Sequence, residues 1–494
     1  VEVPPPAAGP GEILVKNAFS LVSAGTERST VEMGQASLLG KARQRPDLAR
    51  QVLNTLRREG LRATINKVRS RLDQWKALGY ACAGVVVEVG EGVTDLGPGD
   101  RVACGGQDRA SHAEFVAVPR NLCAKIPEGV ALEHAAFTTL GAIALHGVRQ
   151  ADVRLGETVA VLGLGLVGQL TVQILRAAGC KVVGWDPQPE ACALAGVKPG
   201  EPDSADAVIV AAATNSSEPM DMAAELCRDR GRVVLVGRTG TELPREVFYR
   251  KELEFRVSRS YGPGRYDPIY EDKGVDYPIG YVRWTEQRNM EAFLWLLAEA
   301  RVNVAPLISH VFPIEEALKA YELITGKTGE RFVGVLLKYQ PSEQPSRPST
   351  AAPAKPGRLC RGPVVLGVIG AGNYAQGVLL PLFKANKDVT LHTVCTATGI
   401  KAEKARQKFG FQIATTDWRA VMADDRINTV LIATRHNLHA ELVCAALQAG
   451  KTVFCEKPLC LRPEELTEIE NALERNNRLM VGFNRRFAPF AERA

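Results

Sequence analysis

Two short glycine-rich stretches carry the clearest chemistry in this sequence. The first, Val159–Gly168, reads VAVLGLGLVG and places Gly163, Gly165 and Gly168 at the spacing GxGxxG between an apolar run and a helix-forming segment. Gly163 permits a tight turn, Gly165 lets the backbone approach a diphosphate, and Gly168 lets the helix pack closely on the strand. The pattern therefore predicts a dinucleotide site with the diphosphate at the helix N-terminus.

The residues beside this loop extend the predicted site. Leu166 and Val167 open the helix, where free N–H groups face the diphosphate. A second apolar run ends at Asp186, where an acid would bind the ribose hydroxyls of NAD. Because strand, helix and acid occur together, we expect cofactor binding rather than a structural glycine turn, with NAD preferred.

The second stretch follows the apolar run 364–369. It contains a strand-to-helix turn with Ala in the last small position, which the fingerprint allows. Its predicted cofactor-binding residues are Gly370, Gly372, Asn373, Tyr374 and Ala375.

The strand after this second loop ends differently. It ends at Thr396, without a carboxylate, and Lys401 and Lys404 follow closely. No acid there would repel a 2′-phosphate, so this second site is predicted to prefer NADP.

The bulk composition is that of a globular protein with several domains. The chain has 494 residues, 46% hydrophobic and 23% charged, with a net charge of +6. No apolar run is long enough to span a membrane and no secretory signal is visible. Eleven single cysteines without a CxxC pair indicate reduced thiols. We expect a cytoplasmic protein.

Two segments look different from the rest. Residues 37–72 look helical, and the basic stretch 57–71 is interleaved with apolar residues, which favours a solvated helix face over a nucleic-acid-binding patch. Residues 340–362 are rich in proline and serine and are predicted to form a semi-rigid linker between domains.

The first two thirds of the chain resemble a known family. The sequences GPGDRV at 97–102, AEF at 113–115 and AAFTTLGA at 135–142 precede the first glycine loop. This set is similar to the medium-chain dehydrogenases/reductases of the alcohol-dehydrogenase type. The resemblance implies a GroES-like β-barrel domain over residues 1–130, rejoined by residues 265–339, and a first Rossmann domain over residues 131–264.

The sequence departs from that family at its catalytic zinc. Ser23 or Ala24 stands where the family has a cysteine, and Tyr80-Ala81 replaces the His-Glu pair. Zinc prefers thiolate, imidazole or carboxylate donors, so no metal is predicted. A substrate carbonyl would then be polarised by hydrogen-bond donors, for which Tyr80, Thr26 and Arg28 are candidates by position.

The surroundings of these candidates are expected to be simple. The segment 20–27 should leave its strand as a loop that could face a substrate. His112, His134 and His146 are interpreted as core or helix histidines.

Two later stretches leave alternatives open. Only about 20 residues separate Asp186 from the next apolar run at 207–213, so this crossover is shortened or residues are missing from it. The stretch 258–284 holds five tyrosines and three arginines. It is either a rigid surface loop at a contact or a lid over a hydroxyl-rich substrate.

The last part of the chain resembles a second family. The second glycine loop, ATRHNLH at 433–439 and EKP at 456–458 occur in an order similar to that of the Gfo/Idh/MocA sugar oxidoreductases. The resemblance implies a second Rossmann domain over residues 363–485. Residues 486–494 would begin a substrate-binding domain that carries an aspartate–histidine catalytic pair, so we expect a truncated chain with an incomplete second active site.

This second resemblance also assigns site residues. Lys457 would lie beside the nicotinamide and the substrate and would donate to the substrate oxygen or shuttle its proton. Glu456 would support the lysine and Pro458 would fix the turn. Thr434 and His439 would contact the cofactor, with His439 a cap or contact rather than a base.

Together these features predict an α/β protein with two Rossmann-type doubly wound parallel sheets, the first preceded by a GroES-like β-barrel domain. The predicted function is NAD(P)-dependent hydride transfer on a sugar or nucleotide-sugar substrate, without zinc. The alternatives are an NAD(P)-binding scaffold with reduced catalysis and a redox-sensing protein. We expect a homo-oligomer with a small carbohydrate substrate, and neither nucleic acid nor membrane as a partner.

Overall fold

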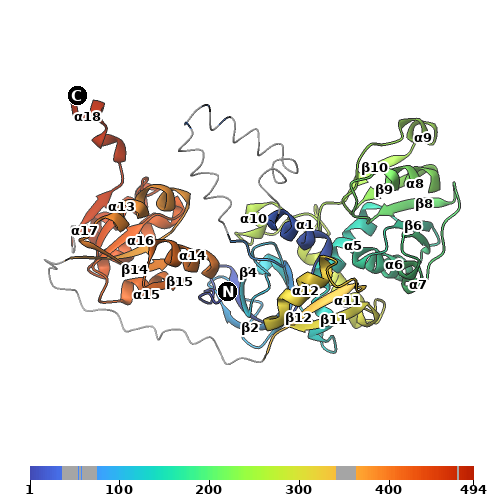
Figure 1. Cartoon of the computed structure of the whole chain (residues 1–494), viewed down its shortest axis with the longest axis horizontal. Helices are drawn as coiled ribbons and strands as arrows, with labels where there is room; N and C mark the ends of the chain where they lie inside the picture. Colours follow the sequence, from blue (N-terminus) through green and yellow to red (C-terminus); the bar gives the residue numbers. More distant parts are fainter. Residues whose placement is uncertain are drawn as a thin grey trace. The chain divides into compact units, whose positions relative to one another are not determined.

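The computed structural model describes residues 1–35, 54, 57, 60, 75–340, 363–474 and 478–493. The chain forms two compact units (Figure 1). The N-terminal unit comprises Ala8–Asp73 and Ala77–Pro341, and the C-terminal unit comprises Ser342–Ala494 with Val1–Ala7 and Gln74–Lys76. Most of the expected helical segment 37–72 and the expected linker from residue 341 onward lie outside the described residues.

A mixed sheet of seven strands forms one half of the N-terminal unit. Its order is β11-β12-β1-β2-β3-β5, and β4 pairs with β1. The long strand β1 has three antiparallel partners, which joins the start of the chain to the much later β12. The strands are β1 (Glu12–Val22), β2 (Ala81–Val89), β3 (Arg101–Gly105), β4 (Phe115–Pro119), β5 (Cys123–Lys125), β11 (Ile308–Pro313) and β12 (Gly334–Lys338).

Helices pack around this sheet. They are α1 (Ala24–Gln35), α4 (Leu132–Ala135), α5 (Thr138–Gln150), α10 (Pro268–Glu271), α11 (Glu286–Ala298) and α12 (Ala317–Ile324), with 3₁₀ turns η1 (Arg120–Leu122), η2 (Ala305–Leu307) and η3 (Ile314–Glu316). The loop predicted for residues 20–27 is wrong. Strand β1 continues to Val22, and α1 begins at once because the Glu27 carboxylate accepts the N–H of Ser23 at the helix start.

A parallel sheet forms the other half of the N-terminal unit. Its order is β10-β9-β8-β6-β7. The strands are β6 (Thr158–Leu162), β7 (Lys181–Trp185), β8 (Ala205–Val210), β9 (Cys227–Leu235) and β10 (Glu254–Val257), and the helices are α6 (Leu166–Ala177), α7 (Pro189–Ala195), α8 (Glu218–Leu226) and α9 (Arg245–Arg250). The chain passes from the edge strand β7 through α7 alone to β8, so this crossover is short in the structure.

One continuous apolar core joins the two sheets of this unit. It includes Val15 of β1, Leu140 of α5, Leu170 of α6 and Phe293 of α11. Helices α5 and α11 approach so closely that a side chain at Gly141 would place its Cβ 2.3 Å from the Phe293 ring. The parallel sheet is therefore held firmly against the rest of the unit.

The C-terminal unit is built on six parallel strands in the order β15-β14-β13-β16-β17-β18. The strands are β13 (Val364–Ile369), β14 (Val389–Cys395), β15 (Ile413–Thr415), β16 (Thr429–Ile432), β17 (Thr452–Cys455) and β18 (Leu479–Val481). The helices are the π-helix η4 (Ala375–Leu379), α13 (Leu380–Ala385), α14 (Gly399–Phe409), α15 (Trp418–Ala423), η5 (His436–Leu438), α16 (His439–Gln448), α17 (Pro463–Leu473), η6 (Asn484–Phe487) and α18 (Pro489–Arg493).

Both faces of this second sheet are buried. Along β16, Val430 and Ile432 belong to one apolar cluster, whereas Leu431 between them belongs to another. Successive side chains of a strand point to opposite faces, so helices cover both sides of the sheet. The strand order places a crevice at the carboxyl ends of β13 and β16, where such sheets bind ligands.

The first residues of the chain also belong to the C-terminal unit. The Thr416 hydroxyl donates a hydrogen bond of 2.6 Å to the carbonyl of Pro5. The carbonyl of Pro4 lies so close to Gly399, at the start of α14, that a Cβ there would be 2.1 Å from it. No helix among the described residues is long and apolar enough to cross a membrane.

Candidate functional sites

Each glycine of the first loop has the surroundings expected for its position in the GxGxxG motif. Gly163 has a φ of +86°, and a Cβ on it would lie 2.5 Å from the backbone nitrogen of Ala212. A Cβ on Gly168 would lie 2.0 Å from the Gly163 carbonyl oxygen. In contrast, a Cβ on Gly165 would meet nothing within 4 Å. The loop therefore leaves open space in front of α6, where a diphosphate would bind.

Asp186 closes this loop from the end of β7. Its carboxylate accepts the N–H of Leu164 at 2.7 Å and that of Gln188 at 2.9 Å. Leu166 and Val167 are the half-buried first residues of α6. The structure thus places the glycine loop, the helix start and the acid of the first site side by side.

The second glycine loop repeats this arrangement. Gly370 has a φ of +94°, and a Cβ on it would lie 2.4 Å from the carbonyl oxygen of Ala433. A Cβ on Gly372 would meet nothing within 4 Å. Ala375 is buried, whereas Asn373 and Tyr374 are exposed in front of the sheet.

A glutamine braces each loop, which the sequence analysis missed. Gln169 donates to the Leu164 carbonyl at 2.9 Å, and Gln376 donates to the Ala371 carbonyl at 2.8 Å. Each glutamine directly follows the last small residue of its fingerprint. Their identical positions in the two motifs were the signal that could have revealed them.

The second site also receives a contact from the end of the described chain. Asn484, just after β18, donates to the Tyr374 hydroxyl at 3.0 Å. At the other end of the site, the Thr396 hydroxyl donates to the Thr398 carbonyl at 2.8 Å, and no described residue hydrogen-bonds the buried Thr398 hydroxyl. The preference of this site for NADP stays a prediction.

Lys457 lies at the end of β17, at the carboxyl edge of the second sheet. Its side chain is exposed, and the peptide bond to Pro458 is cis. Glu456 is buried against Gly482, where a Cβ would lie 2.7 Å from its carboxylate. Among the described residues no hydrogen bond joins Glu456 to Lys457, and the support that Glu456 would give the lysine stays a prediction.

His439 joins the two loops that flank Lys457. The ring is fully buried at the start of α16. Its Nδ1 lies 2.6 Å from the Pro458 carbonyl oxygen, and its Nε2 lies 3.3 Å from that of Thr434. A carbonyl oxygen only accepts, so Nδ1 carries a hydrogen and donates it. This geometry makes His439 a clamp between the loops, and its direct contact with a cofactor stays a prediction.

Tyr80 directly precedes strand β2 of the N-terminal unit and faces the start of α1. Its hydroxyl donates a hydrogen bond of 2.6 Å to Ser23 Oγ. Burial raises the pKa of Tyr80 above its usual value, hydrogen bonds with Ser23 and Thr26 oppose the rise, and the charge of Glu27 adds to it. The structure thus brings two of the predicted residues, Tyr80 and Thr26, together.

The groups hydrogen-bonded to Tyr80 are hydroxyls, and the absence of zinc stays a prediction. The hydroxyls of Tyr80, Ser23 and Thr26 take the place of thiolate and imidazole donors. Within the described parts of the chain, no three His, Cys, Asp or Glu side chains gather as a metal site would require. Arg28, the third candidate donor, pairs instead with Glu32 on the exposed side of α1.

The three histidines interpreted as core or helix residues have different surroundings. His112 forms a buried ion pair with Glu27, at 3.1 Å, which sequence reasoning missed. Burial lowers the pKa of His146 to about 4, and nearby Arg149 and Arg259 add to this. His134 lies near Glu133 and is partly exposed.

The tyrosine-rich stretch 258–284 is packed partly into the core. Tyr261 and Tyr270 are buried. Tyr266 and Tyr281 are exposed. A lid made of this stretch stays a prediction.

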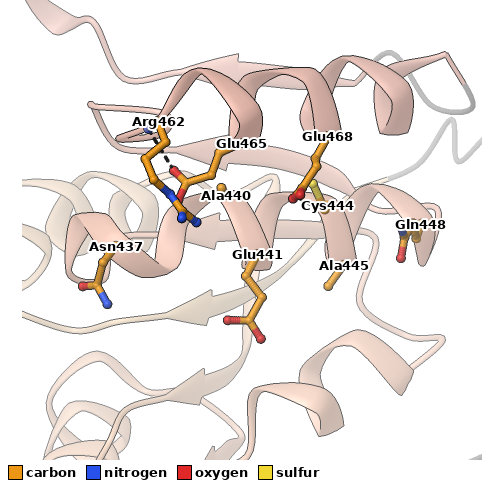
Figure 2. Close-up of a pocket in the computed structure, with 9 residues that line it drawn as sticks. All are labelled: Asn437, Ala440, Glu441, Cys444, Ala445, Gln448, Arg462, Glu465 and Glu468. Carbon is orange, nitrogen blue, oxygen red and sulfur yellow. Dashed lines mark hydrogen bonds and ion pairs between the residues drawn. The ribbon is translucent and has the colours of Figure 1, made fainter. Parts of the chain in front are cut away.

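A surface groove lies between α16 and α17 of the C-terminal unit (Figure 2). Arg462 and Glu465 form an ion pair across one end of it. Its lining residues are Asn437, Ala440, Glu441, Cys444, Ala445, Gln448, Arg462, Glu465 and Glu468. No residue of the glycine loop or of the Lys457 turn lines it, so the groove is separate from the candidate site.

Comparisons with known proteins match the two parts of the chain separately. Residues 364–483 match the Gfo/Idh/MocA model, described as an oxidoreductase family with an NAD-binding Rossmann fold. Residues 60–128 match the alcohol dehydrogenase GroES-like domain.

Curated relatives also divide between the two parts. Sorbitol dehydrogenase of Gallus gallus is 28% identical over 301 residues, which cover 54% of this chain and 81% of that protein. Levoglucosan dehydrogenase of Pseudarthrobacter phenanthrenivorans is 44% identical over 89 residues, 18% of this chain and 23% of that protein. An inositol 2-dehydrogenase/D-chiro-inositol 3-dehydrogenase of Lactiplantibacillus plantarum is 34% identical over 127 residues, 25% of this chain and 36% of that protein. The chain thus spans about a third or less of these last two relatives.

A solved structure supports the fold. Galactitol-1-phosphate dehydrogenase from Escherichia coli superimposes with a TM-score of 0.51 at 19% identity, over 68% of this chain and 95% of that one. At this identity the likeness shows the fold alone.

These matches relate residues 60–128 and 364–483 to domains found in dehydrogenase-type oxidoreductases. In particular, the chain combines a GroES-like domain of the alcohol dehydrogenases with an NAD-binding Rossmann domain of the Gfo/Idh/MocA oxidoreductases. Both predicted resemblances and the predicted fold class are confirmed.

Proposed function

We propose that the chain is a two-site NAD(P)-dependent oxidoreductase that transfers hydride to or from a sugar or nucleotide-sugar substrate without zinc. The observation that carries this proposal is the pair of open glycines. Gly165 and Gly372 each have free space where an added Cβ would stand, while Gly163 and Gly370 are enclosed by backbone. Each of the two loops thus has an enclosed first glycine and an open second glycine, which suits each loop to bind a diphosphate.

In the N-terminal unit, Asp186 would hold the ribose hydroxyls of NAD. Tyr80 would turn its hydroxyl from Ser23 to the substrate oxygen as a hydrogen-bond donor, since a tyrosine hydroxyl is protonated at neutral pH and burial raises its pKa further. Thr26 and Ser23 would orient that hydroxyl. The nicotinamide supplies the hydride chemistry when it is bound.

In the C-terminal unit, Lys457 would donate to the substrate oxygen or exchange its proton. The ammonium group has the freedom to do so because it is exposed at the carboxyl edge of the sheet. His439 and Pro458 would hold the turn that carries it. Residues 486–494 would lead into the substrate-binding domain of this unit, and a homo-oligomer is the proposed assembly.

Gly165→Ala and Gly372→Ala test this proposal one site at a time. In both variants the new methyl group meets no protein atom, so the fold should be unchanged, but it would occupy the place of the diphosphate. Gly165→Ala should weaken NADH binding, and Gly372→Ala should weaken NADPH binding, each by about tenfold or more. Titration calorimetry measures both, and the matched control is Gly377→Ala, an exposed position with equally free space.

If neither variant weakens cofactor binding, the proposed sites are wrong. In a separate experiment, turnover of the unaltered protein is measured from nicotinamide absorbance with a panel of sugars and nucleotide sugars. Cofactor binding at both sites without turnover would support the NAD(P)-binding scaffold or the redox sensor instead.

A further inference from the structure

A buried carboxylate lies directly behind the proposed active site of the N-terminal unit. Glu27 is 3% exposed and accepts hydrogen bonds from three parts of the chain. The N–H of Ser23 donates at 2.8 Å, the His112 ring donates from Nε2 at 3.1 Å, and the Tyr321 hydroxyl of α12 donates as well. Among the described residues, no lysine or arginine pairs with Glu27.

His112 links Glu27 to two further hydroxyl groups. Its Nδ1 lies 2.7 Å from Ser20 Oγ, which lies 2.8 Å from the Tyr339 hydroxyl. The Glu27 carboxylate is therefore fixed in place by donors from separate parts of the chain.

Ser23 connects this charge to Tyr80. Its N–H is held by Glu27, and its Oγ accepts the Tyr80 hydroxyl at 2.6 Å. Thr26, which also hydrogen-bonds Tyr80, precedes Glu27 in the same helical turn. A carboxylate that holds both the backbone of Ser23 and the start of α1 thus determines where Tyr80 finds its partners.

We propose that Glu27 is a positioning residue of the N-terminal active site: it holds Ser23, the acceptor of the Tyr80 hydroxyl, so that this hydroxyl is placed to turn from Ser23 to the substrate oxygen as a hydrogen-bond donor. This inference rests on the proposed function of Tyr80. The titratable groups that face Glu27 are His112 and Tyr321, which touch it, and Tyr80 and Tyr339, whose pKa values its charge raises.

The test replaces the charge and keeps the shape. Glu27→Gln retains an oxygen acceptor but removes the negative charge beside Tyr80. In this variant the ionisation of Tyr80 should move to lower pH, because the charge of Glu27 raises the pKa of Tyr80. It is read as the tyrosinate absorbance that Tyr80→Phe abolishes. The alkaline limb of kcat/KM should move by the same amount, with KM for NADH unchanged.

Two further variants keep the result interpretable. Glu27→Asp retains the charge and should keep the Tyr80 ionisation near its original pH, even if the shorter side chain lowers kcat. Glu32→Gln, on the exposed face of the same helix, should change neither quantity.

The possible outcomes separate the two proposals. If Glu27→Gln lowers thermal stability but leaves the Tyr80 ionisation in place, Glu27 is merely structural and the inference is overturned. If Tyr80→Phe retains full turnover, the proposed function of Tyr80 fails. In that case the absorbance titration still reports whether Glu27 controls the protonation of Tyr80.

Discussion

Replacing Glu286 by glutamine should stabilise this protein at neutral and alkaline pH. Glu286 is the first residue of α11 and is fully buried. Burial raises its pKa from 4.5 to about 9, the charge of nearby Glu271 adds to the rise, and Arg265 opposes it. The folded protein therefore keeps this carboxyl protonated at pH 7, whereas the unfolded chain does not.

The size of the effect follows from this difference in pKa. Below pH 4.5 the carboxyl is protonated in both states, so it adds no pH dependence. Between that value and about pH 9 the unfolded chain releases a proton that the folded protein retains, so the free energy of unfolding falls as the pH rises. The loss is about 1.4 kcal/mol per pH unit, or about 3 kcal/mol at pH 7.

Glutamine does not titrate, has nearly the same volume, and can donate an N–H to the neighbouring Tyr261 hydroxyl. Urea unfolding of the wild type and Glu286→Gln at pH 5, 7 and 9 measures the effect. The stability difference should widen with pH at about the slope given above. Glu32→Gln, at an exposed position, is the control and should show no such trend. A difference that stays constant from pH 5 to 9 would refute a protonated Glu286.

Three further predictions concern the cofactor sites. Asp186→Asn should weaken NADH binding about tenfold and bring it close to that of NADPH, because the ribose loses its charged acceptor; calorimetry measures both affinities, and an unchanged ratio would contradict the role of Asp186. His439→Phe fills the same buried space but loses the hydrogen bond to Pro458. It should weaken NADPH binding severalfold, and equal binding would show that the clamp is dispensable. Lys457→Ala should lower kcat about 100-fold or more in a chain that includes the substrate-binding domain, while NADPH binding remains; unchanged turnover would remove Lys457 from the mechanism.

The sequence alone was sufficient for features whose causes are local. Each glycine loop is determined by a backbone turn at Gly163 or Gly370, by an open position two residues later, and by the apolar strand before it. These conformational requirements involve only about ten neighbouring residues, so they can be recognised from the sequence. The short crossover after Asp186 was equally readable, because the number of residues limits how many elements can fit.

Only the tertiary structure could decide which distant side chains share a site. Glu27 and His112 are 85 positions apart in the sequence. They are in contact because the fold brings β1, α1 and the loop before β4 together. Glu286 resembles an ordinary helix-starting acid until its burial is known. His439 is read as a cofactor contact in the motif, whereas packing turns its ring toward the Pro458 carbonyl. Burial and long-range hydrogen bonds arise from the whole fold, so no local pattern of residues encodes them.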